Sequence, residues 1–427
     1  MAAVPTRGDD APRVVVLDDD PTGTQTVSAV DILLRPTRGR LEAFFRSNAR
    51  ALYVLTNTRA LERAAAVEHL GRIRDEVDRA AHRMNCRWTP VLRGDSTLRG
   101  HVFAETDLFA RDGAAILFVP AFPEGGRVTL AGAQHVTIDG DLHNVADTEF
   151  ARDPTFAYKS RDLVRWVAET GGGRDATLVP LSELREKGAS AVASSLAHAR
   201  PRTVVIPEAT TMEDLQAVAA GYHAALSAGA HVVVRTASSL AAILAGLTPH
   251  NIVRVPIAAG GRVLIACGSF TAASAMQVAA LTALRVPRVE IGLDRIPRHV
   301  ASEVRACLAH DGFAIVTTPP LRVDDGSLAS GATMMERLAD VVRRVRSDVD
   351  AVIAKGGITS ARLAMALGAD VARVEGQLAP GVAVWTLNLR NSGRLPYVVV
   401  PGNVGGPTTL VDALAAMRPG ATGQASA

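Results

Sequence analysis

The sequence predicts an α/β protein with two domains, each a mostly parallel sheet flanked by helices. Short apolar runs of strand length alternate with helical segments, and this alternation restarts after a stretch rich in Pro and Gly. The chain has 427 residues, of which 48% are hydrophobic and 21% are charged. It therefore has the length and the composition of a globular protein with more than one domain.

The first alternation occupies the N-terminal half of the chain. Strands are expected at residues 14–17, 52–55, 115–119, 203–206 and 231–234. Residues 59–83 carry apolar side chains at helical spacing with charges between them, which predicts a helix. Residues 122–160 are richer in Gly, Pro, Asp and His than their surroundings, and we expect them to form a long functional loop.

The second alternation follows residues 256–262 (PIAAGGR), whose composition is typical of a linker. Strands are expected at 263–267, 313–316, 350–355 and 397–400, with an amphipathic helix over 330–348. We therefore predict domains at 1–257 and 258–427, with a hinge near residue 258. The small, polar tails 1–11 and 418–427 are expected to be mobile.

Composition argues against several partners. The net charge is only +3, aromatic residues make up 4%, and basic residues are interleaved with acids, so no nucleic-acid partner is expected. Apolar stretches are too short to span a bilayer, and the first residues lack the apolar core of a signal peptide, which predicts a cytoplasmic protein without a membrane partner. Three widely spaced cysteines favour reduced thiols.

Three consecutive carboxylates follow the first apolar run, in VVVLDDDPTGTQT (14–26). The carboxyl end of a parallel strand is the usual place for ligands. Asp18, Asp19 and Asp20 would repel one another there unless some are solvated, some cap a helix, and some meet a cation or a sugar hydroxyl. A capped turn without a ligand is the structural alternative.

A second polar turn follows a strand in VLRGDSTLRGH (91–101). Arg93 and Arg99 can each present a planar fork to a carboxylate or a phosphate. Asp95 and Ser96 offer an acceptor and a hydroxyl beside them, although both could merely cap a helix that starts near residue 98. His101 adjoins the turn and is expected to hydrogen-bond a ligand oxygen.

A third strand leads into VPAFPEGGRVT (119–129), which carries Glu124 and Arg127. Three strand ends with acids, hydroxyls and guanidinium groups predict one shared cleft. Its chemistry fits a small, polyhydroxylated, anionic ligand.

The strand ends of the second domain are glycine-rich and nearly free of acids: ACGSFTAAS (266–274), AKGGITSAR (354–362) and VPGNVGGPTT (400–409). Glycines before Ser or Thr at a helix start let backbone N–H groups approach a phosphate. An ordinary tight turn is the alternative for each motif, but three together favour a phosphate site. Lys355 is either a counter-charge for the phosphate or a solvated surface lysine.

Two enzyme classes and one binding function fit these motifs. In a kinase, the acidic domain would hold a hydroxy acid and the glycine-rich domain a nucleotide. In a haloacid dehalogenase-like phosphatase, Asp18 would be the nucleophile of a D-x-D-x-T motif. That reading lacks a lysine anywhere from 57 to 94 and leaves the glycine-rich half unexplained. A non-catalytic sugar-acid-binding protein ranks last.

In chain order, LDDDPTGTQT, RGDSTLRGH, PAFPEGGRVT, CGSF, KGGITS and PGNVGG resemble the four-carbon acid sugar kinase family. The resemblance implies an N-terminal sugar-acid-binding domain and a C-terminal nucleotide-binding domain. It also implies the use of ATP and Mg²⁺ to phosphorylate a hydroxyl of a small sugar acid of the threonate, erythronate or 3-oxo-tetronate type. The residues then expected to contact ATP are Ser269, Lys355, Gly356, Gly357, Thr359, Gly402, Asn403, Gly405 and Gly406.

The resemblance also suggests roles in the first domain. Asp19 and Asp20 are expected to bind substrate hydroxyls or a metal, with one of them as general base, and Asp95 is the alternative base. Arg93 or Arg99 is expected to pair with the substrate carboxylate. The remaining expected substrate contacts are Thr22 and Gly23, which shape the turn, and Ser96, His101, Glu124 and Arg127.

Two departures from the family pattern bear on these roles. Val400 stands where many members have a lysine, which removes one phosphate contact. The long form DDDPTGTQT replaces the commoner DDxTG, which leaves the substrate open. The sequence does not identify the metal ligands, and a homodimer is expected only because it is the commonest oligomer.

Overall fold

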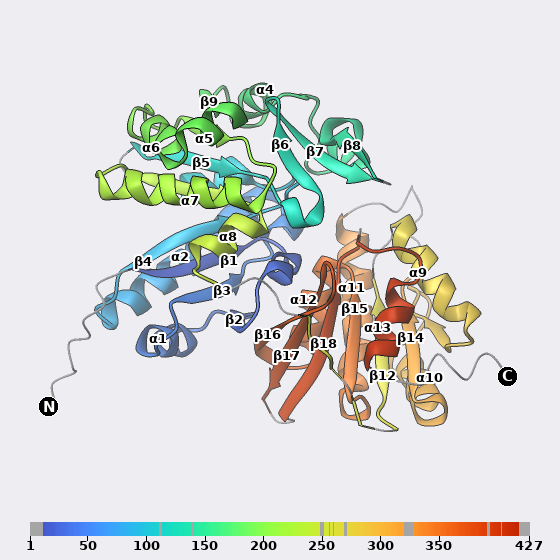
Figure 1. The fold of residues 1–427 in the computed structure, drawn as a ribbon. Coiled ribbons are helices and arrows are strands. Elements are labelled where there is room, and N and C mark those ends of the chain that lie inside the picture. Colours follow the sequence, from blue (N-terminus) through green and yellow to red (C-terminus); the bar gives the residue numbers. More distant parts are fainter. Residues whose placement is uncertain are drawn as a thin grey trace, which may run out of the picture. The chain divides into compact units, whose positions relative to one another are not determined.

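The computed structural model describes residues 12–110, 113–138, 140–247, 252–255, 257–258, 260–268, 271–319, 328–390, 393–402 and 404–417. The chain divides into two compact units, whose elements are labelled in Figure 1. The N-terminal unit contains Met1–Asp19 and Pro36–Leu247, and the C-terminal unit contains Asp20–Arg35 and Thr248–Ala427. The predicted division at 257/258 stays a prediction; in the observed units, the segment Asp20–Arg35 groups with the C-terminal unit. The predicted mobile tails lie outside the described residues.

The sheet of the N-terminal unit is parallel throughout, with the strand order β3-β1-β4-β11-β5-β10-β9. The strands are β1 (Arg13–Asp18), β3 (Ala51–Leu55), β4 (Trp88–Arg93), β5 (Ala115–Val119), β9 (Ala176–Val179), β10 (Val204–Pro207) and β11 (Val232–Thr236). In register, Asp18 pairs with Arg93 and Arg93 pairs with Thr236. The carboxyl ends of β1, β4 and β11 therefore lie side by side.

Helices connect these strands, as the alternating pattern predicted. They are α1 (Arg38–Arg46), α2 (Arg63–Arg83), α3 (Val102–Asp107), α4 (Leu163–Thr170), α5 (Leu181–Lys187), α6 (Ala189–Ala197), α7 (Met212–Ser227) and α8 (Ser238–Leu244). The helix predicted over 59–83 begins at Arg63, after a short 3-10 turn, η2 (Thr58–Ala60). Its buried residues recur at helical spacing, so this face packs into the unit.

The segment 122–160, predicted to be a long loop, contains regular structure. β6 (Arg127–Leu130), β7 (Ala133–Ile138) and β8 (Asp141–Asn144) form a three-stranded antiparallel sheet, visible in Figure 1 beside the main sheet of this unit. Ala131 and Gly132, the two residues between β6 and β7, both have positive φ angles, of 51° and 75°. Such a turn matches the twist of paired strands, but Ala-Gly is not its usual sequence signature.

The sheet of the C-terminal unit is mixed, with the strand order β13-β14-β12-β15-β18-β17-β16-β2. Its strands are β2 (Val30–Leu33), β12 (Val263–Cys267), β13 (Arg288–Glu290), β14 (Phe313–Thr317), β15 (Ala351–Lys355), β16 (Ala369–Ala379), β17 (Val382–Leu389) and β18 (Gly393–Val400). The first five strands in this order are parallel, whereas β18, β17, β16 and β2 pair antiparallel. The predicted α/β class with mostly parallel pairing is confirmed.

The helices of this unit are α9 (Ala272–Ala283), α10 (Pro297–Asp311), α11 (Leu328–Arg344), α12 (Gly357–Ala366) and α13 (Thr409–Met417). The N-terminal segment that joins the unit contributes β2 and the 3-10 helix η1 (Pro21–Thr26). Trp385 Nε1 donates a 3.0 Å hydrogen bond to Thr24 Oγ1, which fixes η1 against the antiparallel strands. Among the described helices, none is both long enough and apolar enough to cross a bilayer.

Candidate active site

A network of buried charges lies where β1, β4 and β11 end. Arg235 on β11 is only 1% exposed, and its Nη2 donates to Asp19 Oδ2 at 2.9 Å while its Nη1 donates to Glu105 of α3. Arg93 Nη1 donates to Asp18 Oδ1 at 3.0 Å and lies 3.8 Å from Asp19 Oδ1. Each of these charges is costly to bury alone, so the guanidinium groups and carboxylates depend on one another.

The two oxygens of Asp19 have different surroundings. Oδ2 accepts the hydrogen bond from Arg235, whereas Oδ1 accepts none from the residues that the structure describes. Burial raises the pKa of Asp19, against the opposing effect of Arg59, Arg235 and Arg93, and Glu105 adds to the increase. Asp19 is thus anchored through one oxygen and retains the basicity that a proton acceptor needs.

The glycines of the RGDSTLRG turn make room for Arg235. A Cβ atom at Gly94 would lie 2.6 Å from Nε of Arg235, which is closer than real contacts allow. At Gly100, where φ is +123°, a Cβ would lie 3.1 Å from both Arg235 Nη2 and Asp19 Oδ2. The backbone of the turn therefore closes directly over this ion pair, which only glycine permits.

Asp95 also pairs with arginines, but its pKa shifts in the opposite direction from that of Asp19. It accepts a 2.7 Å hydrogen bond from Arg99 Nε and another from the hydroxyl of Thr97, and Arg59 lies 3.5 Å away. Burial acts to raise the pKa of Asp95, but Arg99, Arg59 and Thr97 outweigh it and hold the pKa well below its usual range. Asp95 is consequently a poorer proton acceptor than Asp19.

The two arginines predicted to bind a carboxylate already have internal partners. Arg93 is buried against Asp18. Arg99 pairs with Asp95, lies 3.6 Å from Asp153, and stacks over the ring of Phe150. Each guanidinium is thus largely neutralised by the protein itself, which disfavours a primary role in binding an external anion.

Arg127, at the start of β6, is in a different situation. Its Nη1 donates to the carbonyl of Gly125, and its guanidinium carbon lies 5.8 Å from the centre of the Phe122 ring. Its Nε is buried without a hydrogen-bond partner, and among the described residues no carboxylate lies within ion-pair distance. Burial lowers the pKa of Arg127, with Asp95 opposing that effect. Among the described residues, Arg127 is thus less fully paired than Arg93 and Arg99.

The other residues of this unit that were predicted to contact the substrate form hydrogen bonds within the protein. His101 Nε2 forms a 2.8 Å hydrogen bond with the carbonyl of Leu61, so Nε2 carries the proton. Glu124 accepts a hydrogen bond from Ser239 at the start of α8. Ser96 is buried, and its carbonyl accepts a 2.9 Å hydrogen bond from Gln134. Their contacts with a ligand stay predictions.

The three consecutive carboxylates are divided between the units. Asp18 and Asp19 belong to the N-terminal unit, whereas Asp20 begins the segment that joins the C-terminal unit. The backbone N–H of Thr22 donates a 2.8 Å hydrogen bond to Asp20 Oδ1, so Asp20 caps η1. A Cβ at Gly357 would lie 2.5 Å from Asp20 Oδ2. Asp20 therefore lies at the start of α12, among the residues predicted to contact a nucleotide.

The three glycine-rich turns also begin at matching positions. In register, Cys267 at the end of β12 pairs with Lys355, and Lys355 pairs with Val400 at the end of β18. Gly356 has a φ angle of +109°, and α12 begins at Gly357. The N–H groups of the first turn of a helix favour an anion, as the sequence analysis expected.

Some of these glycines serve internal packing. A Cβ at Gly268 would lie 2.8 Å from both Met335 Cε and Thr359 Oγ1, and Gly357 leaves space for Asp20. At Gly406, by contrast, nothing lies within 4 Å of the position of a Cβ. The carbonyl of Gly402 accepts a 2.8 Å hydrogen bond from Thr271. Two predicted contacts, Ser269 and Asn403, lie outside the described residues.

Lys355 is fully buried, so the alternative of a solvated surface lysine is wrong. Its Nζ donates to the carbonyls of Pro401 at 2.7 Å and Val404 at 3.3 Å, which ties β15 to the PGNVGG loop. Burial lowers the pKa of Lys355 to about 8. The positive charge of Lys355 is thus buried against the PGNVGG loop, and it is lost when the pH rises above about 8.

Four residues of the N-terminal site were missed by sequence reasoning: Arg59, Glu105, Arg235 and Ser239. Arg235 had a readable signal, because a charged residue ends the apolar run HVVVRT at the carboxyl edge of a predicted strand. Glu105 and Ser239 lie on ordinary helical segments, where only the three-dimensional structure shows what they face.

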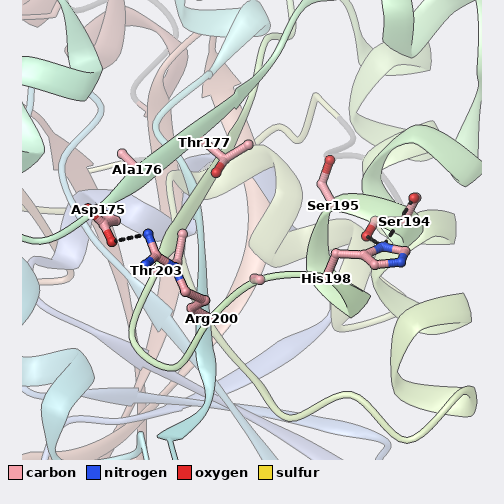
Figure 2. A pocket seen from close by; sticks show the side chains of 9 residues that line it. Asp175, Ala176, Thr177, Ser194, Ser195, His198, Arg200 and Thr203 are labelled. Atoms are coloured by element: carbon pink, nitrogen blue, oxygen red, sulfur yellow. Dashed lines mark hydrogen bonds and ion pairs between the residues drawn. The ribbon is translucent and has the colours of Figure 1, made fainter.

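A surface pocket lies elsewhere in the N-terminal unit. Figure 2 shows its lining, which comes from the amino ends of β9 and β10 and the end of α6; its volume is about 480 Å³. Arg200 and Asp175 are both exposed there and pair at 2.7 Å. Because the strands are parallel, this pocket is at the opposite edge of the sheet from Asp19 and Arg235.

Comparison with known families matches both halves of the chain. Residues 14–244 match the family described as the sugar-binding N-terminal domain, and residues 264–410 match the family described as the nucleotide-binding C-terminal domain. These matches agree with the observed division into a unit rich in carboxylates and arginines and a unit rich in glycine turns.

Two curated proteins of Cupriavidus necator are similar in sequence. The 3-oxo-tetronate kinase is 27% identical over 340 residues, which cover 75% of this chain and 76% of that protein. The D-threonate kinase is 29% identical over 303 residues, which cover 67% of this chain and 70% of that protein.

Two solved structures share the fold. A protein from Haemophilus influenzae has a TM-score of 0.63 at 18% identity, and a protein from Salmonella typhimurium LT2 has a TM-score of 0.68 at 16% identity. Each comparison covers 94% of this chain and at least 98% of the other. At these identities the likeness concerns the fold alone.

Proposed function

The chain belongs to the four-carbon acid sugar kinase family, and from this premise we propose that it transfers the terminal phosphoryl group of ATP to a hydroxyl of a four-carbon sugar acid. Threonate, erythronate and 3-oxo-tetronate are the candidate acids. The observation that carries the proposal is that one unit contains both a carboxylate with a raised pKa, Asp19, and an arginine, Arg127, that has no carboxylate within ion-pair distance among the described residues. A hydroxy acid needs a proton acceptor for its hydroxyl and a cation for its carboxylate.

The acid substrate would be held in the N-terminal unit. Arg127 would pair with its carboxylate, because Arg93 and Arg99 already have internal carboxylate partners. Asp19 would accept the proton of the attacking hydroxyl, because Asp95 has a pKa held well below that of an effective base. This assignment replaces the expectation that Arg93 or Arg99 binds the carboxylate.

The nucleotide would be held in the C-terminal unit. The aligned ends of β12, β15 and β18 and the first turn of α12 offer backbone N–H groups, and Lys355 supports the PGNVGG loop from below. Phosphoryl transfer demands mainly positioning and charge compensation, which such a surface supplies. The name of the matched C-terminal family supports this proposal.

Magnesium would be held by Asp20 together with the phosphates of the nucleotide. Asp20 Oδ2 lies beside Gly357, at the helix start where phosphates are expected, and two negative groups there require a cation between them. Among the described residues, no group of three or more His, Cys, Asp or Glu side chains is arranged to hold a metal. A single carboxylate plus phosphates is a common arrangement for Mg²⁺, which would compensate the charge of the transferred group.

The phosphatase alternative has lost support. Asp18 Oδ1 accepts a 3.0 Å hydrogen bond from Arg93 Nη1, and this ion pair weakens Asp18 as a nucleophile. The matched families also account for the glycine-rich half of the chain.

The proposed function is tested by following ADP formation from Mg-ATP with threonate, erythronate and 3-oxo-tetronate. Phosphate release from the phosphorylated acids, without ATP, is measured in parallel. ADP formation that depends on one of the acids would support the kinase and identify its substrate. Phosphate release without ATP would favour the phosphatase, and binding of an acid without either reaction would favour a non-catalytic binding protein.

A further inference from the structure

Gln134, the second residue of β7, joins three parts of the N-terminal unit through one side chain. Its Oε1 accepts a 2.7 Å hydrogen bond from Thr129 Oγ1 on β6. Its Nε2 donates to the carbonyl of Ser96 at 2.9 Å, in the RGDSTLRG turn, and to the carbonyl of Pro120 at 3.0 Å, directly after β5. The residue is only 1% exposed. An amide turned by 180° would place its oxygen against two carbonyl oxygens, so these partners fix its orientation.

The register of the β6–β7 hairpin places Gln134 and Arg127 on the same face. Gln134 lies opposite Thr129, and Val136 lies opposite Arg127. Because side chains alternate along a strand, Arg127 and Thr129 share one face of the hairpin with these two partners. Val136 is 3% exposed and belongs to a buried apolar cluster of the unit. The face that carries Arg127 is therefore the face that packs on the rest of the unit.

One buried amide thus spans the gap between Arg127's hairpin and the charged turn after β4. Gln134 is bonded to Ser96, which follows Asp95 in the chain. The charges of Asp95 and Arg99, in the same turn, influence Arg127. The distance between the Arg127 guanidinium and the polar groups of the turn consequently depends on how the hairpin is held at Gln134.

Other contacts hold the hairpin to a different part of the unit. The backbone of Thr129 pairs with that of Ala209, and the N–H of Gly132 donates to the carboxylate of Glu208. Both partners follow β10, and neither contact uses the side chain of Gln134. The hairpin should therefore stay attached when Gln134 is replaced, while its separation from the RGDSTLRG turn is no longer fixed by the amide.

We propose that Gln134 is a positioning residue, which holds Arg127 at the distance from the RGDSTLRG turn that binding of the sugar-acid carboxylate requires. This inference rests on the proposed function, in which Arg127 pairs with that carboxylate. The polar atoms of Gln134 all have partners within the protein, so Gln134 acts only through Arg127. Its loss should weaken binding of the acid and leave binding of the nucleotide unchanged, because the residues expected to contact ATP lie in the other unit.

The test measures the Kd of the sugar acid and the Kd of ATP separately, by isothermal titration calorimetry of the full-length protein. The acid is whichever of threonate, erythronate and 3-oxo-tetronate the wild type binds. Gln134→Leu removes all three hydrogen bonds at similar side-chain size, so the Kd of the acid should rise by about tenfold or more. The Kd of ATP should stay within about twofold of the wild type.

A double-mutant cycle with Arg127→Gln separates positioning from general loosening. Because Gln134 acts through Arg127, adding Gln134→Leu to Arg127→Gln should change the Kd of the acid by less than about twofold. If the two effects on the Kd multiply instead, Gln134 does not act through Arg127 and the proposal is overturned.

Asp214→Asn is the matched control, because it removes buried hydrogen bonds in the same unit at the start of α7, away from the hairpin. It should lower the melting temperature without changing the Kd of the acid. An increase in that Kd equal to the increase in Gln134→Leu would mean that any loss of stability weakens the site, which would overturn the proposal.

Folding of each variant is checked by circular dichroism, because Gln134→Leu leaves buried carbonyls without a donor. If it does not fold, Gln134→Asn decides the question: it keeps the amide but is one methylene shorter, so it should also weaken acid binding alone. Acid binding at the wild-type Kd in the folded variant would refute the positioning role, while acid-dependent ADP formation by the wild type would still support the kinase. A wild type that binds none of the acids would refute both.

Discussion

Asp19 and Asp95 show how two carboxylates in one site acquire different chemistry. Both lie beside arginines, Asp19 buried and Asp95 partly buried, but Asp95 also accepts hydrogen bonds from Arg99 and Thr97, whereas one oxygen of Asp19 accepts none from the described residues. Burial raises the pKa of Asp19, whereas at Asp95 the effect of burial is outweighed by Arg99, Arg59 and Thr97, which lower its pKa. Divergent shifts of this kind separate a proton acceptor from an electrostatic anchor.

Replacement of Asp19 by Asn should lower kcat by about a hundredfold or more, because the amide cannot accept the hydroxyl proton. The KM for ATP should change little, since the residues expected to contact the nucleotide lie in the other unit. Steady-state kinetics of Asp19→Asn and of Asp175→Asn, a control on an exposed ion pair, test this prediction. Wild-type turnover in Asp19→Asn would exclude Asp19 as the base.

Replacement of Arg127 by Gln should raise the KM for the sugar acid by about tenfold or more, because a charged hydrogen bond to the substrate carboxylate is lost. The KM for ATP should stay close to that of the wild type. Arg165→Gln, on the exposed surface of α4, is a control for the loss of one positive charge. If Arg127→Gln and Arg165→Gln have the same KM for the acid, Arg127 is not the carboxylate receptor.

At the scale of elements, α7 is fixed by its first turn. Thr211 and Asp214 form a capping box, and Arg185 pairs with Asp214 at 3.0 Å. Burial acts to raise the pKa of Asp214, but the hydrogen bonds from Arg185, Thr210 and Thr211 outweigh it and lower the pKa from its ordinary 3.8 to about 2. The ionised carboxylate is therefore favoured by folding.

Asp214→Asn should lower the melting temperature at neutral pH by about 2–4 °C, which corresponds to the loss of about 1 kcal/mol. A lowered folded-state pKa contributes stability that is present above pH 4 and lost as the pH falls toward 2. The difference between wild type and variant should accordingly shrink over that range in thermal denaturation scans. A constant difference would show that the charge of Asp214 is not what stabilises the helix.

Lys355, at the start of the KGGITS turn, is hydrogen-bonded to the PGNVGG loop, and its pKa of about 8 predicts that the affinity for nucleotide depends on pH. The positive charge is present below that pH and lost above it, so the affinity for nucleotide should fall as the pH rises. We expect the KM for ATP in the wild type to increase about tenfold from pH 7 to pH 9, in proportion to the loss of the protonated form. In Lys355→Met the KM should be high and independent of pH; a flat profile in the wild type would contradict the prediction.

The sequence predicted most of the parallel strands, because most are short apolar runs, but it missed β9 (ATLV) and β13 (RVE). It did not predict β16 and β17, where charged and polar residues interrupt the apolar ones, or the hairpin of β6 and β7, whose Ala-Gly turn lacks the usual signature. Residues 122–160 were consequently predicted to be a loop.

The candidate site was predicted as a set of motifs, but not as a set of contacts. The motif residues Asp19, Asp95 and Arg127 were identified, whereas the pairing of Arg93 with Asp18 was not, because an arginine beside a predicted cleft has the same sequence signature whether it faces a ligand or a carboxylate. Arg235 is 216 residues from Asp19 in the chain. Only the register of β1, β4 and β11 brings these side chains together.

At the scale of the whole molecule, the acidic motif serves both units. The chain passes from the N-terminal to the C-terminal unit after Asp19 and returns after Arg35, so adjacent carboxylates have separate environments. Asp19 joins the arginine network, and Asp20 caps η1 and lies beside Gly357. In the proposed reaction, this one motif would thus contribute a residue to the acid site and another to the nucleotide site. The homodimer expected from the sequence analysis stays a prediction.

Transfer of the labelled terminal phosphoryl group from γ-labelled ATP to a sugar acid tests the central claim most directly. The account predicts a labelled phosphorylated acid from threonate, erythronate or 3-oxo-tetronate, formed in step with ADP by the wild type and strongly reduced in Asp19→Asn. The corresponding four-carbon polyol, which lacks the carboxylate, should be a poor acceptor. Label that appears only as inorganic phosphate, with no labelled acid, would contradict the account.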